Sequence, residues 1–398
     1  MTIYIQHGYG KGEKIDKALE DNSIGGIILN PSGESPEKLQ QTISLYAESG
    51  INIMFDPQFY ACVIDNACCP RLAGYPYFTS NLTQRDFISP KKIFSYISDI
   101  ISFQNDLNLN TILSPTCMID SFEGSWNQVA LTMAQCSIEF CEDNNIKKEV
   151  YSSFVISELA FRSDNIQALN DFIASVTSFN CNNIYLIIER SNRSYKPHMD
   201  PDILENILYL IFCLADRNNI KIVCGYADLI GLLYLTAGAS AIGTGWHYKL
   251  RQFSRSNFEE STGGRTPKDR YTSLPLLSSI YNSPELSRII EENQLGNVLS
   301  GTPYDNIILE DGAISPRWTQ NISYYHHLFS LNKLSAQIQE FNNVDQRVDF
   351  FLNEIKKAKS SYNKLRMRNV LFDNNNNGYH LEQWEEALNN FKSTLSNL

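Results

Sequence analysis

Three acidic side chains follow short apolar runs of this sequence. Asp56 follows INIMF, Glu158 follows SFVIS and Glu189 follows YLII. A carboxyl group at the end of an apolar run can act as a general acid or base, or can accept hydrogen bonds from the nitrogens of a heterocycle. We predict catalytic roles for Asp56 and Glu158. The alternatives are an Asp56 carboxylate that accepts hydrogen bonds from loop amides and a Glu189 salt bridge with a neighbouring arginine.

A second group of candidates lies where another apolar run ends in glycine. Gly243 and Gly245 flank Thr244, and this position carries no carboxylate, thiol or imidazole. Backbone amides between glycines can approach an anion closely, and the following segment contains several cationic residues. The alternative is a tight turn that binds nothing, followed by a solvated loop. The phosphate- or partner-binding candidates are Gly243, Thr244, Gly245, Arg251, Arg265 and Lys268.

Other site chemistries have weaker support in the sequence. Cys62, Cys68 and Cys69 form a C-x5-C-C pattern that matches no tetrahedral zinc spacing. The glycine-rich HGYGKG at residues 7–12 has the wrong spacing for a dinucleotide fingerprint. His7 and His247 could act as ligands or bases, although lone histidines more often make structural hydrogen bonds. We therefore expect no metal and no cofactor, and zinc in particular is not expected.

The elements that would position these residues alternate regularly along the chain. Eight short runs read as strands and are separated by helical segments, which implies parallel pairing with right-handed crossovers. The pattern predicts an α/β fold, a (β/α)8 TIM barrel, with a doubly wound open sheet as the alternative. In a barrel the strands end at one shared mouth, so the candidate residues would face each other. The predicted strands are Ile3–Gln6, Gly26–Leu29, Ile51–Phe55, Thr111–Ser114, Tyr151–Ile156, Ile184–Ile188, Lys221–Cys224 and Ala241–Gly243.

The character of the chain changes after the eighth strand. Residues 247–280 read as a long polar loop, Pro284–Glu292 as a helix, and 296–316 as a turn-rich linker. Helical patterns then cover about 322–360 and 381–396. We predict a barrel domain at 1–300, including the loop 247–280, and an all-helical C-terminal appendage at 301–398.

The bulk composition narrows the class of protein. The 398 residues are 43% hydrophobic and carry a formal charge of −11, which works against non-specific attraction to nucleic acid. The sequence shows no membrane-spanning run and no signal peptide. Nine cysteines, mostly in apolar segments, fit reduced core thiols. We expect a cytoplasmic protein that does not use tRNA or DNA as its main partner.

Several stretches of the chain resemble the tRNA-guanine transglycosylases, the queuine/archaeosine tRNA-ribosyltransferase superfamily. GGIILNPSGESPEKLQQTISLYAESGINIMFDPQFYA resembles the early barrel of that family, and RWTQNISYYHHLFSLNKL is similar to its Trp and His-His-Leu helix. The resemblance spans roughly residues 20–340. It places Asp56 on the family's catalytic Asp and Glu158 on its nucleobase-reading Gln. It implies a nucleobase pocket made by Asp56, Phe59 or Tyr60, Glu158, Glu189 and Tyr226.

The chain also departs from that family at its reactive positions. Gly243 and Thr244 stand where the strand-8 Asp nucleophile belongs, Pro115 and Thr116 replace the strand-4 Asp, and the zinc-binding cysteines before Trp318 are missing. Within the superfamily the chain most resembles the transglycosylase-like accessory protein of type IV CBASS anti-phage operons. That resemblance implies a 7-deazaguanine-type ligand and, as partners, a cyclic-oligonucleotide synthase, a QueC-like enzyme or a second copy in a homodimer.

Three hypotheses follow from these observations. The first is a barrel that handles a 7-deazaguanine-type nucleobase or a partner protein in anti-phage defence, without base exchange in tRNA. The second is a non-catalytic scaffold that binds operon partners through its helical tail. The third is a phosphate-binding or glycosidase-like enzyme that uses Asp56 and Glu158 as an acid/base pair.

Overall fold

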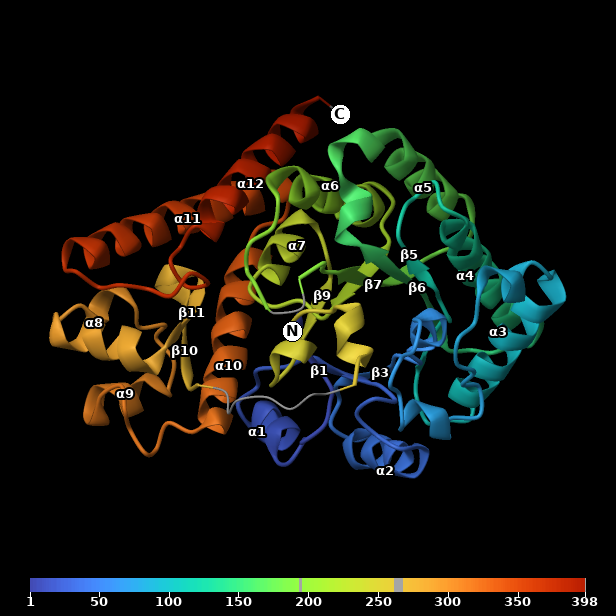
Figure 1. The fold of residues 1–398 in the computed structure, drawn as a ribbon, viewed down its shortest axis with the longest axis horizontal. Helices are drawn as coiled ribbons and strands as arrows, with labels where there is room; N and C mark the ends of the chain where they lie inside the picture. Colours follow the sequence, from blue (N-terminus) through green and yellow to red (C-terminus); the bar gives the residue numbers. More distant parts are fainter. Residues whose placement is uncertain (193–194, 261–267, 398) are drawn as a thin grey trace.

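The computed structural model describes residues 1–192, 195–260 and 268–397, and a parallel β barrel lies at its centre (Figure 1). The strands pair in the order β3-β2-β1-β9-β8-β7-β6-β4, and every pair is parallel. The Thr111 side chain of β4 donates a hydrogen bond of 3.1 Å to the Ile53 carbonyl of β3, so the first and last strands of this order also meet. The predicted (β/α)8 barrel is confirmed. The strands are β1 (Ile3–Gln6), β2 (Gly26–Leu29), β3 (Asn52–Phe55), β4 (Thr111–Leu113), β6 (Glu149–Ser157), β7 (Asn183–Glu189), β8 (Lys221–Gly225) and β9 (Ala241–Thr244).

The barrel strands are apolar because they are buried on both faces. Every residue of β1, β2 and β9 is buried, as expected for parallel strands enclosed by helices. The fourth strand position is split, since the two-residue β5 (Met118–Ile119) pairs with β6 farther along than β4 does. The strand predicted at Thr111–Ser114 corresponds to β4, whereas β5 was not predicted.

Seven helices follow the strands in the expected alternation. Pro stands at the first position of α2, α3 and α6, where its missing N–H costs no hydrogen bond. Asp200 caps α6 through its side chain, whereas Ser35 makes no such bond to α2. The helices are α1 (Lys14–Glu20), α2 (Pro36–Tyr46), α3 (Pro90–Asn105), α4 (Ser125–Asp143), α5 (Ile166–Ser178), α6 (Pro201–Phe212) and α7 (Gly231–Ala237).

The helix that lies between α7 and α1 comes from much later in the chain. It is α10 (Gln320–Gln339), which packs against α1, α7 and β1 and therefore takes the place of the eighth barrel helix (Figure 1). Asn332 of α10 also donates a hydrogen bond to the Asn22 carbonyl just after α1.

The segment between β9 and α10 holds more regular structure than the sequence predicted. An antiparallel hairpin of β10 (Arg270–Ser273) and β11 (Ser278–Tyr281) occupies the end of 247–280, so the prediction of a loop is wrong there. Two short helices follow. α8 (Ser287–Glu291) confirms the helix predicted near Pro284–Glu292, whereas α9 (Asp305–Asp311) lies within the predicted linker.

Two further helices, α11 (Val344–Met367) and α12 (His380–Ser396), form the C-terminal end. They pack against each other, and α12 covers α6, where the ring centroids of Phe391 and Phe212 are 6.0 Å apart. The boundary at residue 300 stays a prediction, because α10 of the proposed appendage lies in the helical ring of the barrel.

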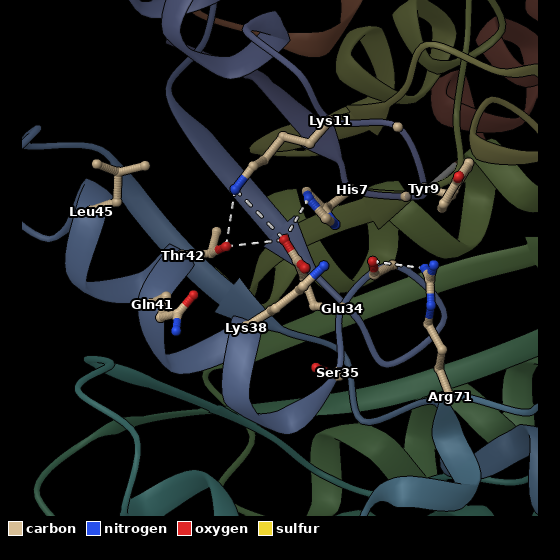
Figure 2. Close-up of a pocket in the computed structure, with 13 residues that line it drawn as sticks. His7, Tyr9, Lys11, Glu34, Ser35, Lys38, Gln41, Thr42, Leu45 and Arg71 are labelled. Carbon is tan, nitrogen blue, oxygen red and sulfur yellow. Dashed lines mark hydrogen bonds and ion pairs between the residues drawn. The ribbon is translucent and has the colours of Figure 1, made fainter.

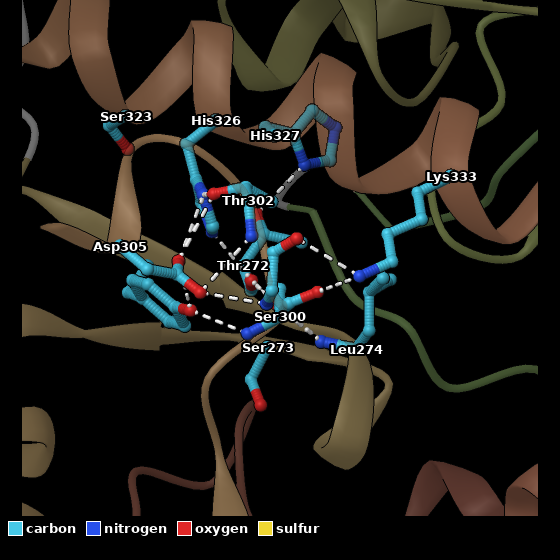
Figure 3. Close-up of polar contacts among 12 residues, drawn as sticks. Thr272, Ser273, Leu274, Ser300, Thr302, Asp305, Ser323, His326, His327 and Lys333 are labelled. Atoms are coloured by element: carbon cyan, nitrogen blue, oxygen red, sulfur yellow. Dashed lines mark hydrogen bonds and ion pairs between the residues drawn. The ribbon is translucent and has the colours of Figure 1, made fainter. Parts of the chain in front are cut away.

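A buried polar cluster joins the hairpin to α10 (Figure 3). His326 contacts the Thr302 hydroxyl through Nδ1 at 2.9 Å and the Thr272 carbonyl through Nε2 at 2.8 Å. His327 contacts the Thr272 hydroxyl through Nδ1 at 2.9 Å, and its Nε2 lies 2.8 Å from Asp228 at the end of β8. The adjacent histidines of the HHL motif thus connect the hairpin, α10 and the barrel.

Across residues 1–192, 195–260 and 268–397, each helix is too short or too polar to cross a lipid bilayer.

Candidate functional site

Asp56 lies at the centre of a buried hydrogen-bond network inside the barrel. Its Oδ1 accepts a hydrogen bond of 2.9 Å from the Gln58 amide, and its Oδ2 accepts bonds from the hydroxyls of Tyr60 at 2.8 Å and Tyr185 at 3.5 Å. Tyr185 also donates to the Gln6 side chain at 3.4 Å. The carboxylate is therefore held in one orientation by donors from the β3–α3 connection and from β7.

Burial changes the acidity of this carboxyl group. Removal from water raises the pKa of Asp56 to about 6, although the hydrogen bonds from Gln58, Tyr60 and Tyr185 act in the opposite direction. A carboxyl group with a pKa near neutrality can both accept and release a proton at physiological pH. Asp56 thus has the acidity expected of a general base.

Glycines of β8 and β9 make room for this network. A Cβ atom at Gly225 would lie 2.4 Å from the Tyr185 hydroxyl, and one at Gly243 would lie 3.1 Å from the Gln6 side-chain oxygen. A Cβ atom at Gly245 would lie 2.3 Å from Cβ of Leu250. Side chains of the barrel and its covering loop therefore occupy the space beside these glycines. No observation within the described residues favours an anion at Gly243, Thr244 or Gly245.

Two residues of the network have an unusual backbone conformation. Gln58 and Tyr226 have positive φ angles of 52° and 53°. Side chains other than glycine and asparagine rarely adopt this left-handed region, and such strain concentrates at functional sites. The Gln58 side chain donates a hydrogen bond of 3.2 Å to the Tyr226 hydroxyl, so the two strained residues contact each other.

A cavity of about 210 Å³ lies beside this pair at the mouth of the barrel. We call it the mouth cavity. Gln58 and Tyr226 form part of its wall, and Phe253, Phe258 and Leu250 from the segment after β9 form an apolar side. The Phe253 ring packs edge-on against Tyr60 and Tyr226, with centroid distances of 5.2 Å in both cases. Asp56 does not line the cavity and acts on it through Gln58 and Tyr60.

The other two predicted carboxylates belong to different clusters. Glu158 forms a salt bridge with Arg190 and accepts hydrogen bonds from the amide and hydroxyl of Ser191. Glu189 forms a two-point ion pair with Arg255, with N–O distances of 2.7 and 2.9 Å. Neither glutamate side chain makes a hydrogen bond or ion pair to a member of the Asp56 network among the described residues, although the Glu189 backbone forms a β-bridge with Phe253. Among the described residues the Glu189 partner is therefore Arg255 and not Arg190, whereas Arg193 lies outside the described residues.

The predicted aromatic stacker and loop cations are also spread over separate places. Phe59 is buried against Phe87 and Tyr96 outside the mouth cavity, whereas its neighbour Tyr60 contacts Asp56. Arg251 donates a hydrogen bond of 2.8 Å to the Gly245 carbonyl, and it lines a different pocket together with Lys268. Arg265 lies outside the described residues.

A second cavity at the mouth was not predicted from the sequence. It encloses about 480 Å³ between the glycine-rich segment after β1 and the start of α2, and we call it the β1–β2 pocket (Figure 2). Its charged lining residues are Lys11, Glu34, Lys38 and Arg71, with His7 at its base. The signal available in the sequence was HGYGKG, which follows a strand and so had to lie at a barrel mouth. The spacing of its glycines does not match a dinucleotide fingerprint, and that mismatch gave no indication of another kind of pocket.

The Glu34 carboxylate organises one side of this pocket. It accepts a hydrogen bond of 3.0 Å from Thr42, and the Lys11 ammonium lies 3.7 Å away (Figure 2). Nε2 of His7 lies 3.4 Å from the same carboxylate. Burial, assisted by Lys11 and Arg71, lowers the pKa of His7 to about 3, so this ring is neutral at physiological pH.

Within the described part of the chain, no three His, Cys, Asp or Glu residues are arranged to hold a metal ion. Cys62 is buried, whereas Cys68 is exposed.

Comparisons with known proteins give no family for this chain. No family model matches it, and no curated protein matches it. Solved structures match weakly. An O-GlcNAc hydrolase mutant from Thermobaculum terrenum shares 12% identity over 98% of this chain and 94% of its own, with a TM-score of 0.38. An HpcH/HpaI aldolase from Desulfitobacterium hafniense DCB-2 shares 7% identity over 61% of this chain and 85% of its own, with a TM-score of 0.33. A putative fructose-1,6-biphosphate aldolase from Coccidioides immitis shares 11% identity over 85% and 88%, also with a TM-score of 0.33.

Proposed function

We propose that this barrel binds a planar nucleobase of the 7-deazaguanine type in the mouth cavity. The observation that carries the proposal is the hydrogen-bonded pair of Gln58 and Tyr226, which forms a polar part of the wall beside the apolar side chain of Phe253. A purine-like ring needs both surfaces, because its faces are apolar and its edge carries hydrogen-bonding groups. The volume of about 210 Å³ accommodates one such ring and excludes a folded RNA segment.

Each residue of the network has a separate role in this binding. Gln58 and Tyr226 contact the edge of the base, and Phe253 contacts its face. Asp56 is a positioning residue, since it fixes the backbone of Gln58 and the hydroxyl of Tyr60. Glu158 and Glu189 are neutralised by Arg190 and Arg255, and we assign them no contact with the base.

The chain has no carboxylate in β9 that could form a covalent glycosyl intermediate, because Gly243 and Thr244 stand at its end. The proposal is therefore binding of a free or protein-attached base, without exchange of a base in tRNA. The choice of 7-deazaguanines, and of anti-phage defence as the setting, rests on the sequence resemblance to the CBASS accessory proteins.

Isothermal titration calorimetry with 7-deazaguanine bases tests the assignment. The wild-type chain should bind at least one of them, and Gln58→Leu should weaken binding about tenfold, because it removes the polar edge contact. Gln135→Leu on the exposed face of α4 is the matched control and should bind like wild type. If no 7-deazaguanine binds, or if both variants bind equally well, the nucleobase assignment is wrong.

The scaffold hypothesis makes a different prediction. A scaffold should co-purify with the cyclic-oligonucleotide synthase or the QueC-like enzyme of its operon, and Gln58→Leu should leave that complex intact. No observation favours the glycosidase-like hypothesis, because Asp56 and Glu158 lie in separate hydrogen-bond clusters.

A further inference from the structure

We propose that the β1–β2 pocket is a binding site for a phosphoryl group or a similar doubly charged oxyanion. The inference does not depend on the nucleobase assignment, since a different set of side chains carries it. It concerns the mouth of the barrel beside strands 1 and 2, not the eighth-strand glycines considered from the sequence.

The first observation is the charge of the pocket. Lys11, Lys38 and Arg71 come from three different segments and line one cavity of about 480 Å³, although the whole chain carries a formal charge of −11. Glu34 offsets Lys11, whose ammonium lies 3.7 Å from its carboxylate. Lys38 and Arg71 remain as a net positive charge, and a cationic cavity in an acidic protein favours anionic ligands.

The second observation is His7, a buried side chain without a hydrogen bond. It is 1% exposed and lines the pocket, and neither ring nitrogen has a hydrogen-bond partner among the described residues. Nε2 faces Glu34 at 3.4 Å without the geometry of a hydrogen bond. A buried polar group of this kind is costly unless a ligand or water completes it. A neutral imidazole supplies an N–H donor, which an oxyanion accepts.

The third observation is the start of α2, which forms the opposite wall. Ser35 and Lys38 line the pocket, and the Ser35 side chain makes no capping bond to the first-turn amides of this 11-residue helix. Amides at a helix start attract anions, and the helix dipole acts in the same sense, although the exposed Glu37 carboxylate of this turn accepts a hydrogen bond from its own amide and would compete with a ligand for it. The pocket thus combines cationic side chains, the start of a helix and a buried imidazole.

The Arg71 guanidinium is already oriented for such a role. Its Nη1 donates hydrogen bonds to the carbonyls of Ser32 at 3.1 Å and Gly33 at 3.0 Å, and the group lies 5.0 Å from the centre of the Tyr9 ring. The guanidinium has five N–H donors, so an arginine fixed through one nitrogen can still bind an anion through the others. Lys38 makes no hydrogen bond or ion pair with any residue in the described ranges, so it is available to the ligand.

Titration of the full chain with inorganic phosphate, followed by 31P NMR at constant ionic strength, tests the site. The wild-type protein should show saturable binding. Lys38→Gln should weaken it about fivefold, because one charge-assisted contact is lost without disturbing the fold. Lys91→Gln removes an exposed lysine of α3 outside the pocket and should leave the affinity unchanged. Absence of saturable binding, or equal weakening by both variants, would overturn the assignment.

Two further measurements separate the sources of the oxyanion and the two cavities. If ribose 5-phosphate binds more tightly than inorganic phosphate, the pocket serves a phosphorylated metabolite, and equal affinities identify a site for the free ion. The imidazole 15N signals of His7 should shift on saturation, and unchanged signals would contradict the site. Gln58→Leu in the mouth cavity should bind phosphate like wild type, so failure of the nucleobase assignment would leave this one standing.

Discussion

The carboxyl group of Asp56 gives the protein an unusual dependence of stability on pH. Burial raises its pKa from 3.8 to about 6, so between these values the folded chain binds a proton that the unfolded chain has lost. Stability from this group is present below pH 3.8 and is lost as the pH rises through 6. The group therefore destabilises the fold at neutral pH.

Asp56→Asn should reverse this loss. Relative to wild type, the free energy of unfolding of the variant should rise between pH 4 and pH 7, by an amount on the order of 1–3 kcal/mol. Urea unfolding at a series of pH values measures the difference. Asp99→Asn, at an exposed position of α3, should show no such trend. A constant difference for Asp56→Asn across this range would mean that its pKa is not raised.

Glycine at position 225 should be needed for the position of Tyr185. A Cβ atom there would lie 2.4 Å from the Tyr185 hydroxyl, so Gly225→Ala must displace that ring. We expect a loss of about 1–3 kcal/mol in the free energy of unfolding, typical of an overpacked core. Gly296→Ala is the control, because no atom lies within 4 Å of its Cβ position. Equal free energies of unfolding for the two variants would show that the core accommodates the added methyl group without loss of stability.

The sequence revealed only some residues of the site. Asp56 could be found because it is a charged residue directly after an apolar strand. Tyr226 was named through the family resemblance. Gln58 could not be found, since its role depends on a left-handed backbone angle that has no signature in Gln. Phe253 could not be found either, because it lies in the long connection after β9 and reaches the mouth cavity only through the tertiary fold. The partners of Glu158 and Glu189 were missed for the same reason, because both ion pairs are formed by tertiary contacts.

At the level of elements, the paired histidines of α10 connect parts of the chain that are far apart in sequence. His326 bonds both to the loop at Thr302 and to β10 at Thr272, with distances of 2.9 and 2.8 Å. Burial lowers its pKa to about 4, so it is neutral in the folded protein. The ring thus fixes the hairpin against α10 with one neutral side chain.

His326→Ala should loosen this attachment and change the acid response. Loss of two buried hydrogen bonds should lower the free energy of unfolding by about 2–4 kcal/mol at pH 7. In wild type, protonation of the unfolded chain below pH 6.5 removes stability until the folded pKa is reached, and the variant should lack this contribution. Urea unfolding at pH 7 and pH 5 measures both effects. His247→Ala, at an exposed position, is the control, and a similar loss there would contradict the bridging role.

The boundaries of an element could be predicted where a strand was a continuous apolar run or where proline marked the first residue of a helix. β1 and β2 begin and end at the predicted residues, because buried parallel strands leave clear apolar patterns. The hairpin of β10 and β11 was missed because its strands contain many serines and a proline lies between them. α9 was missed because it is a short helix bounded by glycine.

At the scale of the whole molecule, the C-terminal helices should differ in their importance. A chain that ends at residue 342 keeps α10 and loses α11 and α12, which exposes the face of α6 that now contacts Phe391. We expect it to fold with lower stability and to bind a hydrophobic dye. A chain that ends at residue 318 also loses α10 and should not fold. Circular dichroism and urea unfolding compare the two chains, and a stable fold for the shorter one would show that α10 is dispensable.

The place of α10 also constrains the order of events during synthesis. β9 pairs with β1 through Ile3 and Ile242, so the strands can join once about residue 245 has left the ribosome. The helix that covers this seam begins only at Gln320. The nascent chain therefore presents an uncovered apolar seam while the intervening residues are being translated. A chaperone that recognises apolar chains should bind stalled ribosomes from which residues 1–300 have emerged more strongly than ribosomes from which residues 1–345 have emerged.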